Sequence, residues 1–219
     1  MDLPNEPVTS GLVRIMFDLS YDGTNFFGVA RQPGLRTVQS LLEDSLAMML
    51  RVSVQLNCAG RTDAGVHARH QIVHFDLPDV IWNDLGADLL RRLAHFVPSD
   101  IRVNSISLAP SGFDARFSAL RRHYRYRICD VLTGVDLLAR INVLNWHAPL
   151  DEKLMNEASA LLIGKHDFAA FCKKREGATS IRDLEQFTWS SDEDGLLVAG
   201  AVAYAFAHAL VRVLFRPLI

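Results

Sequence analysis

Cysteine is scarce in this chain of 219 residues. Its three cysteines, Cys58, Cys129 and Cys172, are widely spaced. They form neither a CxxC metal motif nor the even-numbered set of a disulfide framework. Such usage is typical of a reducing compartment, so we expect a cytoplasmic protein. No apolar run reaches the roughly 18 to 20 residues of a membrane span, and the first residues lack the basic-then-apolar pattern of an export signal. We therefore expect no membrane association.

Lysine is also rare, with 4 lysines against 19 arginines, and the formal net charge is −2. This balance excludes a polycation that coats nucleic acid through net charge alone. The arginines are unevenly spread: residues 110–129 hold five of them and one acid, Asp114. Because arginine binds phosphate through a flat, bidentate fork and stacks on bases, this stretch indicates local contacts to a phosphate-bearing partner.

Low-complexity linkers and solenoid-type repeats are absent too. With 49% hydrophobic residues the chain can bury the core of one or two globular domains, and we expect disorder only in residues 1–10. Residues 13–21 alternate in polarity as a half-buried strand does, and from the candidate N-cap Thr37 apolar residues recur at helical spacing. Further strands are predicted at 53–58, 70–77, 102–109, 121–130, 142–148, 181–191 and 194–206. The other predicted helices span 82–96, 151–164 and 205–215.

Because strands and helices are mixed without strict alternation, the order of elements favours an α+β fold over a doubly wound parallel sheet. If the chain has two halves, we expect them to share one sheet.

One loop holds an isolated carboxylate. Residues 58–68 read CAGRTDAGVHA, with Asp63 between Gly60 and Gly65. Asp63 can start a turn whose glycines adopt positive φ. It can equally be a catalyst, since a carboxylate on a glycine-flanked loop lets a ribose approach without obstruction from neighbouring side chains.

Five segments occur in an order that resembles a known family. They read YDGTNFFG, RQPGLRTVQSLLEDSL, CAGRTDAGVHARHQIVHF, FDARFSALRRHYRYRI and AFAHALVR. Together they resemble the tRNA pseudouridine synthase A family from about Arg14 to Arg212, and GRTDAGVHA is the most specific element. The resemblance implies a mixed, mainly antiparallel central sheet with helices on one face. It implies two ferredoxin-like halves, residues 11–110 and 111–219, of which the second lacks the family's final helix and strand.

The resemblance also implies three catalytic residues. Asp63 matches the aspartate that such synthases need for uridine isomerisation. Arg212 matches the arginine that pairs with this aspartate, and Tyr124 matches the tyrosine that lies against the target base. Without this resemblance, a strand tyrosine such as Tyr124 would be interpreted as ordinary packing.

A second group of residues is expected to bind RNA. Arg61 corresponds to the family residue that enters the space left by an extruded uridine, and Thr62 adjoins it. Arg31, Gln32 and Arg36 match RNA-facing positions after the first strand. Arg125 belongs to a strand with Arg121, Arg122 and Arg127, and alternate strand residues face opposite ways, so only some of these can contact RNA.

A metal site is not expected. His67, His70 and His74 lack an acid or cysteine at ligand spacing. The family implies neither a metal nor an organic cofactor. Where the family usually carries tryptophan this chain has Val29, and Tyr204 and Ala209 replace the usual residues of the terminal motif. These departures predict weaker packing or RNA contact there.

Three functions remain open. The first is a homodimeric synthase that isomerises uridine at tRNA positions 38–40, in the anticodon stem-loop. The second is a diverged synthase that makes pseudouridine from a free uridine nucleotide or a short RNA for a natural product. The third is an inactive paralogue that binds RNA.

Overall fold

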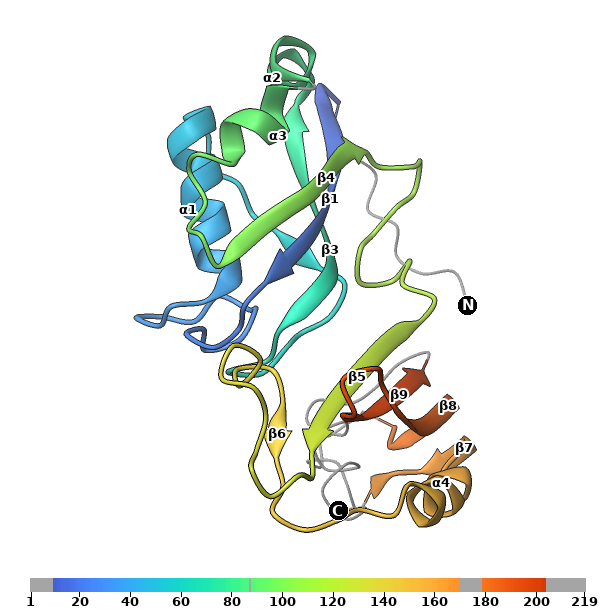
Figure 1. The fold of residues 1–219 in the computed structure, drawn as a ribbon. Helices are drawn as coiled ribbons and strands as arrows, with labels where there is room; N and C mark the ends of the chain where they lie inside the picture. Colours follow the sequence, from blue (N-terminus) through green and yellow to red (C-terminus); the bar gives the residue numbers. More distant parts are fainter. Residues whose placement is uncertain (1–9, 87, 170–178, 204–219) are drawn as a thin grey trace. The chain divides into compact units, whose positions relative to one another are not determined.

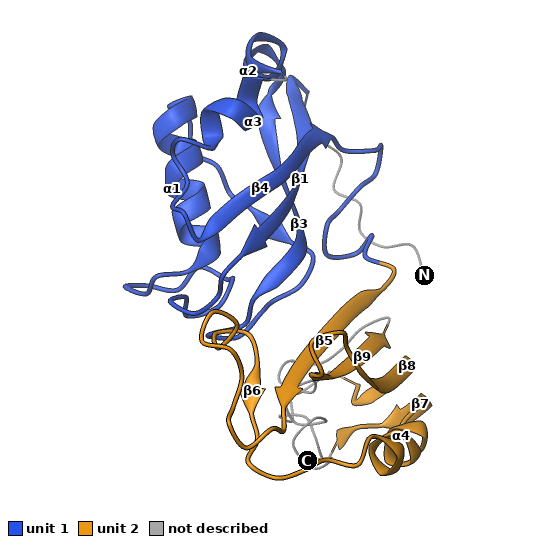
Figure 2. Ribbon diagram, viewed as in Figure 1, with its two compact units in different colours: residues 1–119 blue, residues 120–219 orange. Residues whose placement is uncertain are grey.

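The computed structural model of the protein describes residues 10–86, 88–169 and 179–203 (Figure 1). It divides into two compact units, residues 1–119 (unit 1) and 120–219 (unit 2), which Figure 2 distinguishes by colour. The strands of unit 1 are β1 (Leu12–Tyr21), β2 (Asn57–Cys58), β3 (Ala68–Pro78) and β4 (Ile101–Leu108). Its helices are α1 (Val38–Leu50), α2 (Asp79–Leu85) and α3 (Asp88–Leu93). Unit 2 contains β5 (Arg122–Cys129), β6 (Leu144–Asn145), α4 (Glu152–Ala160), β7 (Gly164–Asp167), β8 (Ile181–Ser191) and β9 (Leu197–Ala203).

Unit 1 is a four-stranded antiparallel sheet with the order β2-β3-β1-β4. Helix α1 follows the first strand, and α2 and α3 follow β3, so the chain runs in the βαββαβ order of a ferredoxin-like fold. All three helices lie on one side of the sheet in Figure 1. The opposite face of the sheet is the one on which β1 and β3 carry charged side chains.

The core of unit 1 follows from the alternation of β1. Its inward residues Ile15 and Phe17 are fully buried, and Ile15 lies opposite Phe75 of β3. The rings of Phe17 and Phe75 meet edge to face, with centroids 5.1 Å apart. Leucines of the three helices complete this cluster. The predicted N-cap is confirmed, because Thr37 Oγ1 accepts a hydrogen bond from the backbone N–H of Ser40 at 3.2 Å.

Unit 2 has a five-stranded sheet with the order β6-β5-β9-β8-β7. Apart from β6 and β7, unit 2 repeats the first half of unit 1: the elements β5, α4, β8 and β9 follow one another along the chain as β1, α1, β2 and β3 do. The pairing is also the same, since β9 lies between β5 and β8 as β3 lies between β1 and β2. Asp151 caps α4, as predicted, by accepting from the N–H of Leu154 at 3.0 Å. The buried Trp189 of β8 donates its indole N–H to Ser159 Oγ of α4 at 2.9 Å, which joins the helix to the sheet.

The predicted α+β class is confirmed, with mainly antiparallel strands and few helices. The expectation of one shared sheet differs from the structure, since the described strands form two sheets, one in each unit. Among the described strands, backbone pairing stays within each unit: β1 pairs with β3 and β4, while β5 lies between β6 and β9.

Several predicted bounds were wrong. The helix expected at 82–96 is two short helices, because the chain at Gly86 takes φ 38°, outside the helical region. The helix expected at 151–164 ends at Ala160, and Gly164, with φ 102°, begins the unpredicted strand β7. Of residues 53–58 only Asn57 and Cys58 pair in the sheet. The predicted helix 205–215 and residues 1–9 lie outside the described residues.

Candidate active site

The loop between β2 and β3 carries Asp63. At its start, the backbone N–H of Ala59 donates to Ile72 O at 2.8 Å, and the side-chain amide of Gln71 donates to Gly60 O. Asp63 then begins a turn in which the N–H of Val66 donates to Asp63 O at 3.2 Å. Gly65 takes φ 77° at the third position of this turn, where a side chain would be strained. The turn interpretation of Asp63 is thus confirmed, with positive φ at Gly65 and not at Gly60.

A second loop packs directly on the first. The N–H of Val29 donates to Thr62 O at 3.2 Å, and the N–H of Gly65 donates to Phe26 O at 3.1 Å. The hydroxyls of Tyr21 and Thr62 are hydrogen bonded at 2.9 Å. The segments YDGTNFFG and GRTDAGVHA, about 40 residues apart in the sequence, therefore form one double loop at the end of the sheet.

His67 joins the two loops at their other end. Its Nδ1 lies 3.2 Å from the backbone N–H of Gly23, from which it can accept, and 3.1 Å from Asp22 Oδ1. Asp22 also accepts from the backbone N–H and the hydroxyl of Thr24, at 3.0 and 2.6 Å. Hydrogen bonds from Thr24 hold the pKa of Asp22 below its usual value, so the carboxylate is charged beside His67.

Asp63 is partly exposed, and the three residues after it, Ala64, Gly65 and Val66, are exposed. Ala64 has only a methyl side chain and Gly65 has none, so these neighbours place little side-chain bulk beside the carboxylate. Cys58, the other candidate nucleophile nearby, is different: burial raises the pKa of its thiol to about 12. A thiol with such a pKa remains protonated at neutral pH and is a poor nucleophile. Cys58 is therefore poorly suited to act as a nucleophile in this loop.

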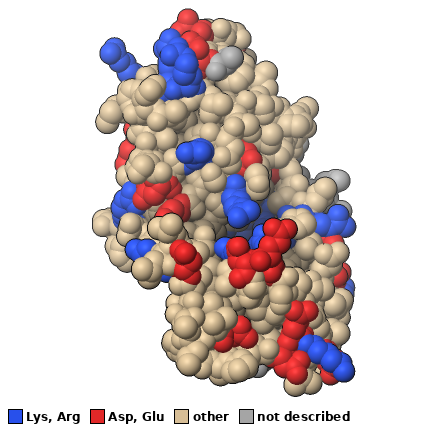
Figure 3. All heavy atoms as spheres, in the orientation of Figure 1, with Lys and Arg blue, Asp and Glu red and all other residues tan. Residues whose placement is uncertain are grey.

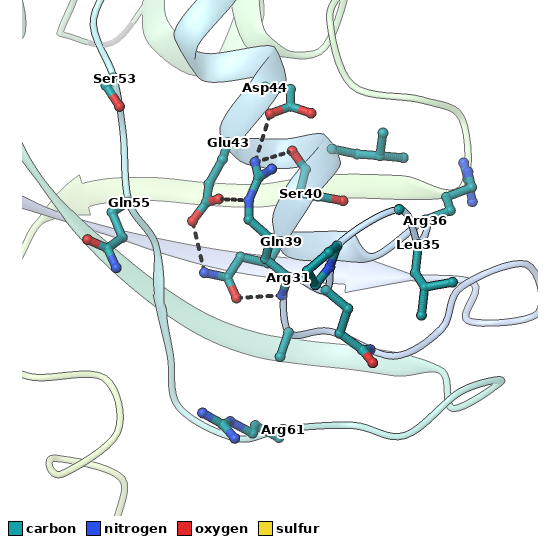
Figure 4. Close-up of a pocket in the computed structure, with 15 residues that line it drawn as sticks. Arg31, Leu35, Arg36, Gln39, Ser40, Glu43, Asp44, Ser53, Gln55 and Arg61 are labelled. Carbon is teal, nitrogen blue, oxygen red and sulfur yellow. Dashed lines mark hydrogen bonds and ion pairs between the residues drawn. The ribbon is translucent and has the colours of Figure 1, made fainter.

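A pocket of about 950 Å³ lies beside the loop, between residues 30–36, helix α1 and residues 53–61 (Figure 4). The pocket is lined by Arg31, Gln32, Arg36 and Arg61. The side-chain amide of Gln32 donates a hydrogen bond to Phe27 O at 2.8 Å. Four residues predicted to bind RNA, three from residues 31–36 and one from the Asp63 loop, are thus brought together in unit 1.

The arginines of this pocket differ in their partners. The Nε of Arg31 donates to Glu43 at 2.6 Å and its Nη2 donates to Asp44 at 2.7 Å. Arg36 forms a bidentate pair with Asp100, at 2.9 and 3.0 Å, and lies over the ring of Phe26. For the exposed Arg61 no ion pair is found within the described part of the chain. Among the described residues, Arg31 and Arg36 of the pocket therefore have acidic partners and Arg61 has none.

The arginine-rich strand β5 belongs to unit 2. Arg121, His123 and Arg125 are exposed, whereas Arg122, Tyr124 and Tyr126 are partly buried, as alternation predicts. Tyr124 packs against the core of unit 2, and burial raises the pKa of its phenol, so the hydroxyl is protonated at neutral pH. Arg127 binds Asp192 at 3.1 Å. Strand β5 therefore contains an exposed arginine, Arg125, and an internally paired one, Arg127, while Arg121, just before the strand, is exposed and binds Glu185 at 2.6 Å.

Comparison with known proteins identifies the family. A family model described as tRNA pseudouridine synthase matches residues 158–219. The tRNA pseudouridine synthase A of Streptomyces avermitilis is 51% identical over 220 residues, which cover 98% of this chain and 77% of the relative. That of Streptomyces griseus is 54% identical over 208 residues, 93% of this chain and 73% of the relative, and that of Frankia casuarinae is 49% identical over 213 residues, 97% and 77%.

This chain belongs to the tRNA pseudouridine synthase A family. It is therefore a pseudouridine synthase, an isomerase that converts uridine to pseudouridine. Of the residues that the resemblance implies are catalytic, Asp63 lies in unit 1 and Tyr124 in unit 2. Arg212 lies outside the described residues, within the segment that the family model matches.

The three histidines considered as metal ligands, His67, His70 and His74, lie beside three different acids. His67 lies beside Asp22, His70 Nδ1 lies 2.9 Å from Asp18, and the buried His74 Nε2 lies 3.8 Å from Asp114. Within residues 10–86, 88–169 and 179–203, no group of three or more His, Cys, Asp or Glu side chains is arranged to hold a metal ion. Nor is any helix in these ranges long and apolar enough to cross a membrane.

The surface charge of the synthase is mixed. On the face shown in Figure 3, basic and acidic side chains are interspersed on both units. Charge alone therefore does not mark out an RNA-binding surface on this face, in agreement with the net charge of −2.

Sequence reasoning missed the residues that hold the Asp63 loop from outside it. Tyr21, Gly23 and Gly28 contact this loop although the sequence assigned them no role. The signal was the pair of glycines in YDGTNFFG, a stretch quoted for its resemblance alone. Val29, which replaces the family's usual tryptophan, is buried among Tyr21, Phe26 and Val38, so the position still packs in the core.

Proposed function

We propose that this synthase acts on uridines of tRNA, at positions 38–40 of the anticodon stem-loop, with Asp63 as its catalytic aspartate. The observation that supports this most is the placement of Asp63 on a loop fixed from both sides, with small, exposed neighbours and an arginine-lined pocket beside it. The relatives named tRNA pseudouridine synthase A support tRNA as the substrate.

The isomerisation breaks the N1–C1′ bond, turns the uracil and forms a C5–C1′ bond. C5 then loses its proton and N1 gains one, so that the product has the composition of the substrate. Asp63 serves as the carboxylate nucleophile that adds to the nucleoside at the start of this sequence, and its bond to the nucleoside breaks again before the product leaves. The protonated hydroxyl and ring of Tyr124 are assigned to the face of the uracil, and Arg212 is assigned to pair with Asp63 and orient it.

RNA binding is assigned to the pocket and to strand β5. Arg61 enters the stack where the uridine has been extruded, with Thr62 beside it. Arg31, Gln32, Arg36 and Arg125 contact the backbone of the RNA. Arg31, Arg61 and Arg125 are all exposed, but Arg31 already binds Glu43 and Asp44, whereas for Arg61 and Arg125 no ion pair is found among the described residues, which suits groups that bind phosphate without first breaking an internal ion pair.

The test uses unmodified tRNA tritiated at C5 of uridine, because pseudouridine formation releases this tritium to water. Asp63→Ala is expected to lower kcat by about 10³-fold or more while tRNA binding persists. Asp84→Ala, which removes an exposed carboxylate from α2, outside the pocket, is the matched control and should retain activity. Release at the wild-type rate by Asp63→Ala would contradict the role of Asp63.

A parallel reaction with free UMP decides the substrate. Dependence on folded tRNA supports the proposal, and turnover of UMP alone would instead support a synthase for small substrates. Failure to convert any tRNA or nucleotide, judged by carbodiimide labelling, would indicate an inactive RNA-binding paralogue.

We propose further that the synthase works as a homodimer in the cytoplasm. Its cysteine usage and its family support these assignments. Light scattering after size-exclusion chromatography of the purified protein measures the mass directly, and a monomer mass at working concentrations would contradict the dimer.

A further inference from the structure

We infer that residues 21–29 are a positioning element for the catalytic loop, in which Tyr21, Gly23 and Gly28 hold the carboxylate of Asp63 in the position and orientation that its reaction needs. This inference rests on the proposed role of Asp63. It concerns a segment to which no catalytic residue is assigned.

The backbones of the two loops touch at both glycines. A β-carbon on Gly28 would lie 2.5 Å from Thr62 O and 3.3 Å from the carbonyl carbon of Asp63. A β-carbon on Gly23 would overlap the carbonyl oxygen of Val66. Both neighbours are backbone atoms, which cannot turn aside as a flexible side chain can. Any larger residue at either position must therefore push the loop that carries Asp63.

Gly23 and Gly28 differ in one useful respect. Gly28 has φ 93°, a conformation that strains any other residue, so replacing it combines backbone strain with the clash. Gly23 is not among the residues with positive φ. A substitution at Gly23 therefore tests the contact with Val66 alone.

Hydrogen bonds hold Asp63 on both sides. Before it, Thr62 is bound through its carbonyl to Val29 and through its hydroxyl to Tyr21. After it, the N–H of Gly65 is bound to Phe26 O. Tyr21 is 5% exposed, so this hydroxyl pair is shielded from water and constrains Thr62 more than a surface pair would.

The consequence is kinetic. A reactive group displaced by about 1 Å can lose on the order of 10²-fold in rate, because the bound geometry is no longer the reactive one. The arginines of the pocket lie on residues 31–36 and at position 61, outside the contacts of Gly23. Pushing the loop at Val66 through a larger residue at Gly23 should therefore lower kcat and leave the KM for tRNA nearly unchanged, whereas Tyr21→Phe, which releases the RNA-binding Thr62, is judged by kcat alone.

The experiment compares four variants of the full chain by kcat, KM for tRNA and melting temperature. Gly23→Ala is expected to lower kcat by about 10²-fold. Tyr21→Phe adds no volume, so it should fold, and it is expected to lower kcat by about tenfold or less. The control is Gly11→Ala: Gly11 has φ 82° but nothing lies within 4 Å of its β-carbon, so it carries the strain without the contact. Asp63→Ala is the fourth variant.

The outcomes separate the two proposals. Inactive Asp63→Ala together with reduced kcat in both loop variants, at unchanged KM in Gly23→Ala, supports the positioning role. If Asp63→Ala is inactive but both loop variants work at the wild-type kcat, the positioning role is overturned while the catalytic role stands. A raised KM at constant kcat, or a loss that only follows the fraction of folded protein, would also overturn it. Active Asp63→Ala overturns the proposed function itself.

Discussion

Glu43 and Arg31 form an ion pair in which the buried carboxylate lies 2.6 Å from the guanidinium Nε. Its other oxygen accepts from the side-chain amide of Gln39 and from the backbone N–H of Leu56, both at 2.8 Å. One acid on α1 therefore fixes the loop after residue 29 and the segment that leads into β2. Both segments border the pocket beside Asp63.

Replacing Glu43 by alanine is expected to cost about 2–4 kcal/mol of unfolding free energy, because a buried N–H and an amide lose their acceptor. Asp44→Ala is the matched control, since it also binds Arg31 but its side chain is 64% exposed. That change should cost about 0–1 kcal/mol. Urea denaturation of both variants measures the difference, and equal losses of stability would show that the buried contacts of Glu43 with Gln39 and Leu56 do not stabilise the fold beyond its pair with Arg31.

Arg61 and Arg36 line the same pocket but should respond differently to substitution. Arg61→Ala is expected to weaken tRNA binding and to reduce the slope of log affinity against log salt by about one. Arg36→Ala removes the bidentate pair with Asp100 and the contact with Phe26, so its main effect should be on stability. Binding titrations at several salt concentrations, with melting curves, separate the two. An unchanged salt slope in Arg61→Ala would remove Arg61 from the phosphate-binding set.

Strand β5 offers a second matched pair. Arg125→Ala is expected to weaken tRNA binding with little change in stability, since Arg125 is exposed. Arg127→Ala should destabilise unit 2 by about 1–3 kcal/mol, since it leaves the mostly buried Asp192 without its arginine. The prediction is wrong if Arg127→Ala is the variant that loses RNA affinity at unchanged stability.

His74 should make stability depend on pH. It is 2% exposed and accepts a hydrogen bond from the N–H of Ala115 at Nδ1, at 3.0 Å. Burial, and then the charge of Arg14, lower the pKa of His74 from its ordinary value of 6.5, although Asp114 and Asp76 oppose this. The unfolded chain then binds a proton that the folded chain does not, so this contribution is complete above about pH 6.5 and is lost as pH falls toward the folded pKa.

The test is His74→Asn, whose amide oxygen can still accept from Ala115. Stability against urea, measured between about pH 7.5 and 5, should fall less steeply in the variant than in the wild type. A wild-type slope retained by His74→Asn would assign the acid sensitivity to other groups.

Much of the fold could be read from local pattern. The alternation of residues 13–21, the cap at Thr37 and the cap at Asp151 were all predicted and are confirmed. The failures occur where one residue overrides the local pattern: Gly86 divides a helix, and Gly164 starts a short strand. The number of sheets was also missed, because strand pairing joins residues distant in sequence, such as Ile15 with Phe75 and Tyr124 with Ala201.

By itself the sequence determined the family, the α+β class and the loop that carries Asp63, because these depend on residue identities and on periodicity within short segments. Only the tertiary structure decided that Tyr21, Gly23 and Gly28 hold that loop, and that Arg31 and Arg36 already have acidic partners while Arg61 meets none in the described residues. The physical reason is that a hydrogen bond or an ion pair depends on which segments fold side by side. Arginines with the same local pattern therefore differ in their partners once the chain has folded.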